Sequence, residues 1–326
     1  MGSMDRKFFV GVDEAGYGPN LGPLVVAASL WSAPADFIEQ QFVDAFSHAF
    51  STRNYSTTCE HVPLGDSKKL YSTQAGLATL EAGLLAMVAT LGITHNQLGD
   101  LIQRVVSTEW IDELSTLAWY NGYIQRSLPV ALFNQSEVMR LSQIACRELA
   151  KHDIELVDLR AAVVCETRFN QAVAKWGSKG ELLSRVTLEL VVSLLNSCPT
   201  ATEVFCDRQG GRKNYLPQLL SAMPDEWFSE IAISNDRSSY RSQGARRVDI
   251  HFSVGGDSFP PTALASMLAK YLRERLMEVL NEFWGKLLPE LKPTAGYPVD
   301  ALRFRQSIET IAQKLDFDVD QWWRCR

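Results

Sequence analysis

Apolar positions along the chain recur with two different spacings, and the spacing predicts which segments are strands and which are helices. Continuous apolar runs typical of strands cover residues 8–12, 24–31, 155–165 and 202–206. Apolar residues at three- and four-residue intervals predict helices over about 33–50, 73–91, 181–195, 261–277 and 300–315. Because the strands and helices interleave, the pattern predicts an α/β fold in which a mixed β-sheet is flanked by helices.

Three further segments complete the expected organisation. The strand-like runs 227–233 and 247–254 flank a polar link, which predicts a hairpin leading into Gly255-Gly256-Asp257. Residues 94–153 show only helical spacing, so we expect a helical insertion that serves packing or guides a substrate. Residues 5–285 are then one catalytic domain, and residues 286–326 a C-terminal helical extension packed on it. Pro-rich joints are too short to separate independent domains.

The segment 8–28 combines two strand-like runs with a concentration of polar chemistry between them. The first run ends on the adjacent carboxylates Asp13 and Glu14, and glycines and prolines separate it from the second run. Neighbouring residues on a strand point to opposite faces, so both carboxylates reach one ion only if the backbone bends or other groups complete the site. Glycines permit such a bend and a close approach of a polymer backbone. The alternative is a hairpin with a solvated acidic tip.

Composition narrows the class of protein further. The chain has 326 residues, 46% of them hydrophobic, which is enough for a full core. The sequence lacks an uninterrupted apolar run of eighteen residues and a signal-like start, so we expect a soluble cytoplasmic protein that binds no membrane. Residues 1–4 resemble an expression-tag remnant. The six cysteines form no Cys-x-x-Cys pair, and Cys165 and Cys206 sit in apolar runs, which favours buried thiols over a zinc site.

The acidic turn resembles the opening motif of the type 2 ribonucleases H, the ribonuclease HII/HIII family. That motif reads Asp-Glu-Ala-Gly-Arg-Gly-Pro and is followed by Gly-Pro and an apolar strand. This chain has Asp13-Glu14-Ala15-Gly16-Tyr17-Gly18-Pro19, with Gly22-Pro23 after it. Tyr17 departs from the pattern, since the family usually has a basic residue there.

Four later segments resemble the same family. Asp66-Ser67-Lys68-Lys69-Leu70 precedes a predicted helix, and the apolar strand 202–206 ends on Asp207. Asp257 is followed after a short spacer by a helix of small and apolar residues with a basic end. Gly296-Tyr297 resembles the segment whose tyrosine meets the sugar of the ribonucleotide, although Thr294-Ala295 replaces the usual His-Lys. The spacing from Asp207 to Asp257 is longer than the family pattern, consistent with the inserted hairpin.

The resemblance implies a ribonuclease-H-like sheet and four metal-binding carboxylates, which would be Asp13, Glu14, Asp207 and Asp257. Carboxylates held close together raise one another's pKa unless cations lie between them. An all-oxygen set with no cysteine or histidine favours Mg²⁺ or Mn²⁺, and two such ions serve phosphodiester hydrolysis. The expected activity is cleavage of the RNA strand of an RNA/DNA hybrid, leaving 5′-phosphate and 3′-hydroxyl ends.

Basic and glycine-rich segments are the expected substrate contacts. Phosphate contacts position a nucleic acid without reading its sequence, and the 2′-hydroxyl distinguishes RNA from DNA. The net charge of −6 does not exclude this partner, because bound ions would more than neutralise the four carboxylates. The candidate substrate-binding residues are Gly16, Tyr17, Gly18, Lys68, Lys69, Arg208, Arg212, Lys270, Arg273 and Tyr297, with Lys213 and Arg275 as further backbone clamps.

Two other functions remain open from the sequence. Tyr17 and Thr294-Ala295 alter the ribonucleotide-reading region, so a nuclease of the same fold that cuts a DNA structure is the first alternative. A nucleic-acid-binding protein without turnover is the second, and the four intact carboxylates argue against it. The expected partner is an RNA/DNA hybrid or a duplex with embedded ribonucleotides. The sequence leaves the oligomeric state open, with a monomer as the default expectation.

Overall fold

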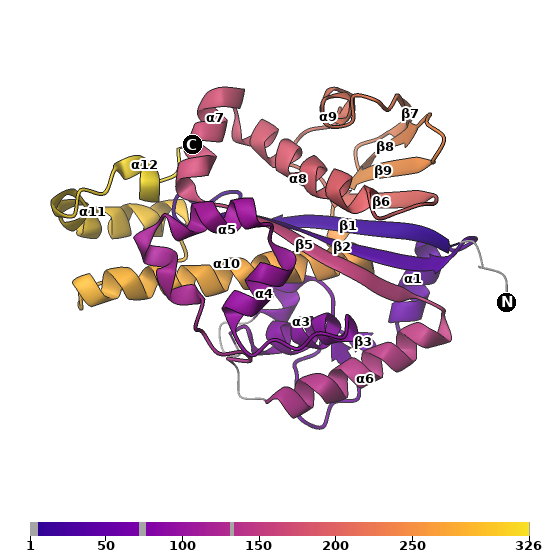
Figure 1. Ribbon diagram of the computed structural model, residues 1–326, viewed down its shortest axis with the longest axis horizontal. Coiled ribbons are helices and arrows are strands. Elements are labelled where there is room, and N and C mark those ends of the chain that lie inside the picture. The colour runs from indigo at the N-terminus through magenta and orange to yellow at the C-terminus, as the bar shows by residue number, and fades with distance from the viewer. Residues whose placement is uncertain (1–5, 72–75, 131–133, 326) are drawn as a thin grey trace.

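A mixed sheet of seven strands forms the centre of the molecule, as a computed structural model shows for residues 6–71, 76–130 and 134–325 (Figure 1). The predicted α/β fold, with a mixed sheet flanked by helices, is confirmed. Across the sheet the strands lie in the order β5-β2-β1-β6-β9-β8-β7. Their bounds are β1 Arg6–Ala15, β2 Leu24–Pro34, β5 Glu155–Val164, β6 Thr202–Asp207, β7 Phe228–Ile233, β8 Arg237–Ser242 and β9 Val248–Ser253, and the short strands β3 Phe50–Ser51 and β4 Val62–Pro63 pair separately.

Strand directions determine which chain segments meet at one edge of the sheet. The two strands predicted within residues 8–31 are β1 and β2, which pair antiparallel with Asp13 opposite Ala27. β1 also pairs in parallel with β6, and β6 pairs in parallel with β9. The carboxyl ends of three neighbouring strands therefore lie at the same edge, and an acidic residue lies at or just beyond each of them.

The region predicted as a two-strand hairpin is a three-strand meander, so that prediction is wrong. The polar link forms strand β8, which pairs antiparallel with both β7 and β9. Its arginines have carboxylate partners that a sequence pattern does not reveal. Arg237 forms a two-pronged ion pair with Glu39, and Arg241 forms one with Asp249 on the adjacent strand. Paired polar side chains let this strand form without an apolar alternation.

Two long helices cover the faces of the sheet, α8 on one side and α10 on the other (Figure 1). β1 lies so close to α10 that a Cβ atom added to Gly11 would lie 2.1 Å from the backbone carbon of Pro261. The helices are α1 Glu39–Phe46, α2 Ser67–Leu70, α3 Ala78–Thr90, α7 Glu166–Trp176, α8 Lys179–Leu195, α9 Leu216–Ala222, α10 Pro260–Leu287 and the short 3₁₀ helix η2 Gly256–Ser258. α7 was not predicted, and the residues at the start of the helix expected from 73 lie outside the described chain.

Helices also make up the segments that flank this core. Within 94–153 they are α4 Leu98–Val105, α5 Thr108–Ser115, the 3₁₀ helix η1 Ala118–Tyr123 and α6 Gln135–Lys151, and in the C-terminal part α11 Pro298–Lys314 and α12 Val319–Trp322. α6 packs on α3, and η1 packs on α10. α12 packs on α7, which brings the last described residues back to the glycine-rich turn after β1. None of the helices in the described ranges has both the length and the apolar character that crossing a bilayer requires.

Candidate active site

Three carboxylates meet where the parallel strands β1, β6 and β9 end. Val12 of β1 lies beside Cys206 of β6, so Asp13 and Asp207 are the next residues on the two adjacent strands. Asp257 follows β9 in helix η2, and the backbone N–H of Gly256 donates a hydrogen bond of 2.9 Å to Oδ1 of Asp207. The structure therefore brings together side chains that the sequence separates by up to 244 positions, as the numbering shows.

Burial and the charges of neighbouring carboxylates act together on the pKa values of Asp13, Glu14 and Asp207. Burial raises the pKa of Asp13 to about 7, and the charges of Asp207 and Asp257 act in the same direction. Burial and then the charges of Asp13 and Asp207 raise the pKa of Glu14 well above its usual value. Burial also raises the pKa of Asp207, and the Gly256 N–H opposes that shift. A cation among these groups would favour their charged forms.

A chain of hydroxyl groups links Asp13 to two distant motifs. Ser266 on α10 hydrogen-bonds to the Asp13 carboxylate, and its hydroxyl lies 3.0 Å from that of Ser67 at the start of α2. Asp66 caps α2 by accepting a hydrogen bond of 2.9 Å from the backbone N–H of Lys68. Both predicted segments, 66–70 and 261–277, thus support the same carboxylate.

The two lysines of the segment 66–70 have different surroundings. The charge of Lys68 lowers the pKa of Glu14 and of Asp207, which places its ammonium group near the carboxylate cluster. The Lys69 side chain is 69% exposed, and its ammonium group lies 4.0 Å from Asp66. Lys68 is therefore positioned to act at the cluster, whereas Lys69 extends into solvent.

The oxygen donors of the carboxylate cluster suit a divalent cation, although the side chains are spaced more widely than a bound ion requires. In the ranges that the structure describes, no three Asp, Glu, His or Cys side chains are grouped closely enough to hold an ion. Asp13 Oδ1 accepts a hydrogen bond of 2.7 Å from the backbone N–H of Glu14, and Asp207 is held by Gly256. The donor set is nevertheless entirely oxygen, and repulsion among buried carboxylates is what a hard cation relieves.

The glycine-rich loop after β1, residues 16–22, has little room on one side and open space on the other. Gly16 has φ +89°, and a Cβ atom there would lie 2.4 Å from Nε of Arg273. A Cβ atom at Gly18 would meet nothing within 4 Å. The backbone at Gly18 is therefore accessible to a large ligand, while the backbone at Gly16 packs against the protein.

Tyr297 lies beside this loop. The carbonyl of Gly296 accepts a hydrogen bond of 2.8 Å from the backbone N–H of Asn20, and a Cβ atom at Gly296 would lie 2.3 Å from the carbonyl oxygen of Leu21. The Tyr297 side chain is 53% exposed at the start of α11. The two segments that the sequence assigned to sugar reading are thus joined through their backbones.

The Tyr17 ring is in contact with a positive charge from another element. The ammonium group of Lys179, at the start of α8, lies 5.1 Å from the ring centroid. Burial raises the pKa of the Tyr17 hydroxyl, the Glu14 charge acts in the same direction, and Arg212 opposes it. Arg212 itself lies 3.4 Å from Glu181. Tyr17 therefore lies between the carboxylate cluster and two cations.

The other predicted clamps are largely engaged within the protein. Arg273 is 2% exposed and donates a hydrogen bond of 2.9 Å to the carbonyl of Ala295, so it supports the Tyr297 segment and has no surface for a phosphate. Arg275 is also buried, with Glu278 at 2.6 Å. Lys270 pairs with Glu274 at 2.8 Å. These positions correct the prediction that the basic end of α10 contacts a substrate.

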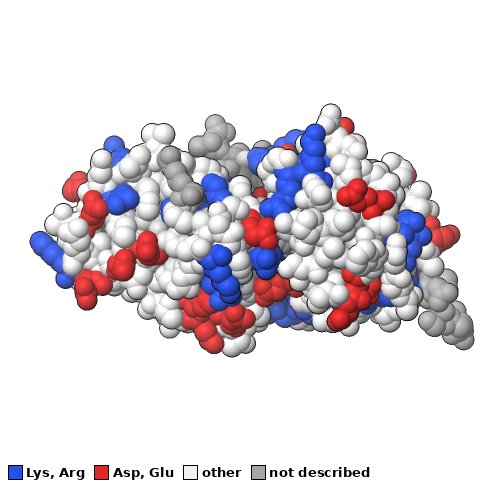
Figure 2. Space-filling view, turned by 90° about the horizontal axis from the view of Figure 1, so that it is seen from above, with Lys and Arg blue, Asp and Glu red and all other residues white. Residues whose placement is uncertain are grey.

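Two clamps on the other side of the site hold the loop before β8. Arg208 donates hydrogen bonds to the carbonyls of Asn235 and Ser234 and to the hydroxyl of Ser238. Lys213 bonds to the Asn235 side chain at 2.8 Å. On the face seen in Figure 2, Lys and Arg side chains gather near the middle with acidic side chains among them. The basic surface is thus local and does not extend over the whole face.

A buried charged network behind the glycine loop was not predicted from the sequence. Arg324 donates hydrogen bonds to the loop carbonyls, and the buried Glu166 accepts bonds from the Gly22 N–H at 3.1 Å and the Tyr120 hydroxyl at 2.9 Å. Burial raises the pKa of Glu166 to about 7 and lowers that of Arg324 to about 9. Each residue stands alone in its segment, so no motif or spacing indicated it.

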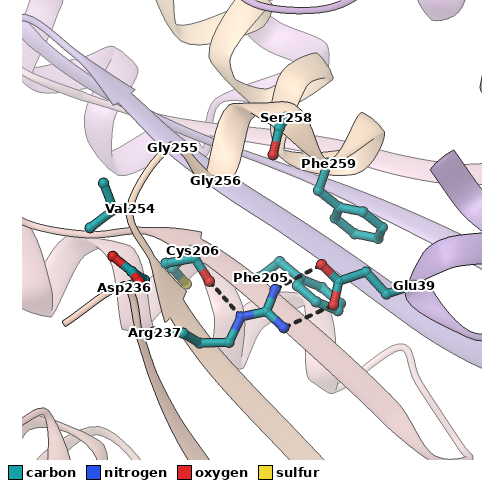
Figure 3. Close-up of a pocket in the computed structure, with 11 residues that line it drawn as sticks. Glu39, Phe205, Cys206, Asp236, Arg237, Val254, Gly255, Gly256, Ser258 and Phe259 are labelled. Carbon is teal, nitrogen blue, oxygen red and sulfur yellow. Dashed lines mark hydrogen bonds and ion pairs between the residues drawn. The ribbon is translucent and has the colours of Figure 1, made fainter. Parts of the chain in front are cut away.

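A cavity of about 190 Å³ lies beside the carboxylate cluster, on the side of Gly256 (Figure 3). The Arg237–Glu39 ion pair crosses it, with contacts of 2.9 and 2.7 Å, and Phe205 and Phe259 form apolar walls. The ion pair joins β8 to α1, and Nε of Arg237 also donates a hydrogen bond of 2.8 Å to the hydroxyl of Ser253 at the end of β9.

This chain is similar to known proteins in structure but not detectably in overall sequence. Scans against protein-family models and against curated proteins find no match. Among solved structures, the PCNA:RNase HII complex from Archaeoglobus fulgidus matches at 15% identity over 98% of this chain and 94% of that chain, with a TM-score of 0.42. Ribonuclease H2 from Pyrococcus horikoshii OT3 matches at 13% identity over 97% of this chain and 92% of that chain, with a TM-score of 0.41. Bst-RNase HIII in complex with Mn²⁺ matches at 15% identity over 97% of this chain and 65% of that chain, with a TM-score of 0.42. Values this low carry no conclusion about activity.

Proposed function

We propose that this chain is a divergent member of the type 2 ribonucleases H, a metal-dependent endonuclease that hydrolyses the RNA strand of RNA/DNA hybrids. The observation that carries the proposal is the convergence of Asp13, Glu14, Asp207 and Asp257 at one sheet edge beside the open backbone of Gly18. Both features belong to the motifs by which the sequence resembles that family. The names of the matched structures agree with it but do not support it further.

The residues of the site divide into three roles in this reaction. Asp13, Glu14, Asp207 and Asp257 would hold Mg²⁺ or Mn²⁺, which when bound supply an activated water and stabilise the leaving 3′ oxygen. Ser266 and Gly256 fix the orientation of Asp13 and Asp207. Lys68 brings a positive charge toward the scissile phosphate. The products would carry 5′-phosphate and 3′-hydroxyl ends.

Substrate choice would be made by the glycine loop and its neighbour Tyr297. A site built to hydrogen-bond a hydroxyl rejects an analogue that lacks the hydroxyl, because its own polar groups would remain unpaired. The backbone of Gly18 faces open space and Tyr297 is half exposed, so both are available to a sugar. Tyr17 offers a ring face in place of the usual basic side chain, and Lys179 beside it supplies a charge.

The environment of Tyr17 also favours a second candidate, a nuclease of the same fold that cuts DNA structures. An uncharged ring stacks on a sugar or base without requiring a 2′-hydroxyl. The segment before Gly296, Thr294-Ala295, contributes no charged side chain to the reading region. This candidate uses the same carboxylates and differs only in what the loop recognises.

Cleavage of four end-labelled substrates separates the candidates. We expect the wild-type protein with Mg²⁺ or Mn²⁺ to cut an RNA/DNA hybrid and a duplex with one ribonucleotide, and to spare plain and branched DNA. Tyr297→Ala should lower cleavage at the ribonucleotide far more than affinity for the duplex. Equal rates on ribonucleotide-containing and all-DNA duplexes, unaffected by Tyr297→Ala, would favour the DNA nuclease. Binding without cleavage in either metal would reject both enzymes.

A further inference from the structure

Arg324 is a buried cation that lies far in sequence from the loop it contacts. Its side chain is 1% exposed, and its Nη1 donates hydrogen bonds of 2.7 Å to the carbonyl of Gly16 and 3.3 Å to that of Gly22. Nη2 donates one of 3.2 Å to the carbonyl of Tyr17. A buried guanidinium is costly unless polar groups compensate it, and here the loop itself provides three acceptors.

The segment around Arg324 is fixed independently of these side-chain bonds. The Arg324 N–H donates to the Asn20 carbonyl at 2.8 Å, and the Asn20 side chain donates back to the Arg324 carbonyl at 3.2 Å. The guanidinium carbon lies 3.9 Å from the ring centroid of Phe169 on α7. Asn170 binds the backbone on both sides of Arg324, at Trp323 and Cys325. The guanidinium is thus presented to the loop from a rigid support.

The bonds from Arg324 also determine where the loop amides point. In a planar trans peptide the C=O and the following N–H are antiparallel. Because the carbonyls of Gly16 and Tyr17 turn toward Arg324, the N–H groups of Tyr17 and Gly18 turn away from it. Within the described part of the chain neither N–H has an acceptor, and Gly18 borders open space. Two free donors therefore point away from Arg324, beside the open space at Gly18.

From this geometry we infer that Arg324 is a positioning residue for substrate reading: it holds the carbonyls of Gly16, Tyr17 and Gly22 so that the Tyr17 and Gly18 amides are preset as hydrogen-bond donors. The inference rests on the proposed function in one respect: that function defines which group of the substrate the two donors recognise. The contact between Arg324 and the loop exists without a substrate, so the two ideas fail separately. Arg324 touches no reacting group, and its effect passes entirely through the loop backbone.

The test compares Arg324→Ala and Arg324→Lys with a matched control, Arg305→Ala. Arg305 also packs on aromatic side chains of the C-terminal segment, at 4.9 Å from the Trp323 ring. Its guanidinium bonds to Glu309, and among the described residues it makes no hydrogen bond to the loop. In a peptide covering residues 16–22, the hydrogen-bonded amides are those of Asn20, Leu21 and Gly22. We expect Arg324→Ala to speed hydrogen exchange at these amides by at least about tenfold, with β5 and β6 unchanged. Lysine should restore this protection only in part, because a single ammonium cannot reach three carbonyls in a fixed fork.

Chemical rescue then distinguishes positioning from general destabilisation. The alanine variant leaves a guanidinium-shaped space, so low millimolar ethylguanidinium should restore loop protection and, on the ribonucleotide duplex, at least several-fold of the lost kcat/KM. The same concentration of urea should restore neither, and Arg305→Ala should need no rescue. Normal exchange at 16–22 in folded Arg324→Ala, or loss of activity that only follows the unfolded fraction and resists rescue, would overturn the inference. Wild-type protein inactive on every substrate would instead count against the proposed function.

Discussion

Asp13 and Asp207 occupy adjacent strand ends, and neutral side chains of the same size test their roles. Asp13→Asn and Asp207→Asn each remove one ligand charge, and bound ions act mainly in the transition state. We therefore expect cleavage of the hybrid to fall below about a tenth of the wild-type rate, with affinity for the hybrid retained. Asp44→Asn on α1 is the control for a surface carboxylate. Turnover above that level in Asp13→Asn would exclude metal binding by Asp13.

Glu166 gives a prediction for stability against pH. Its pKa is raised from 4.5 to about 7 by burial, so the folded protein keeps a proton that the unfolded chain loses in this interval. The stabilising contribution of the protonated form is therefore complete below pH 4.5 and is lost as the pH rises through 7. Glu166→Gln stays neutral at every pH. We expect it to match the wild type near pH 4.5 and to exceed it by about 3 kcal/mol at pH 8.

Urea unfolding at pH 4.5, 6 and 8, with a chelator present, measures this difference between Glu166→Gln and the wild type. Only the difference between the two proteins is informative, because Asp13, Glu14 and Asp207 also have raised pKa values and contribute equally to both. A gap in unfolding free energy that does not change with pH would mean that burial does not raise the pKa of Glu166.

The contact between strand β1 and helix α10 leaves no room for a side chain at Gly11. A Cβ atom at Gly11 would lie 2.1 and 2.2 Å from backbone atoms of Pro261 and Thr262, which cannot rotate away as a side chain can. Gly11→Ala should therefore lower the free energy of unfolding by about 1–3 kcal/mol. Because Asp13 is two residues further along β1, cleavage should fall as well.

Gly285→Ala on the same helix is the matched control in the same urea titration. An added Cβ there meets nothing within 4 Å, and alanine favours a helix over glycine by about 1 kcal/mol. We expect this variant to be slightly more stable than the wild type. Equal stability of Gly11→Ala and the wild type would show that β1 and α10 can separate at no cost.

Elements with a strong apolar pattern were predictable, and those held by paired polar groups were not. Strand β6 has the predicted bounds because its apolar run ends on a charged residue. Strand β8 contains Arg237 and Arg241, whose carboxylate partners lie on other elements, so its sequence resembles a loop. The candidate carboxylates of the site could be proposed from the sequence because each lies in or beside a short motif of a few residues. Arg324 and Glu166 are single residues whose roles come only from tertiary packing.

At the scale of the whole molecule, an acidic protein is proposed to bind a polyanion. Charges cluster locally in this chain, so affinity should depend on a few cations near the site and not on the net charge of −6. Binding to a hybrid should weaken steeply with salt. The double variant Lys68→Ala with Lys69→Ala should lose one to two phosphate contacts. Each contact contributes about 0.9 to the slope of log affinity against log salt on a B-form duplex, so the slope should become less steep by that amount per contact.

Affinity measured by fluorescence anisotropy between about 50 and 200 mM salt, where counterion release has a large effect, checks this dependence. Lys151→Ala is the control, since Lys151 is exposed on α6 and pairs with Glu148. We expect Lys68 to account for most of the change, because its charge acts on Glu14 and Asp207. If the double variant keeps the wild-type slope, the two lysines make no phosphate contact.

The bond from Arg324 to the glycine loop also fixes an order of events in the life of the chain. Gly16 and Arg324 are 308 residues apart. At roughly 5–20 residues per second, a ribosome completes the loop about 15 to 60 seconds before it adds the arginine. Throughout that interval the loop carbonyls lack their cation, even where β1 has already paired with β2. A nascent chain therefore acquires Asp13 and Glu14 early, whereas Asp207, Asp257 and the preset amide donors come late.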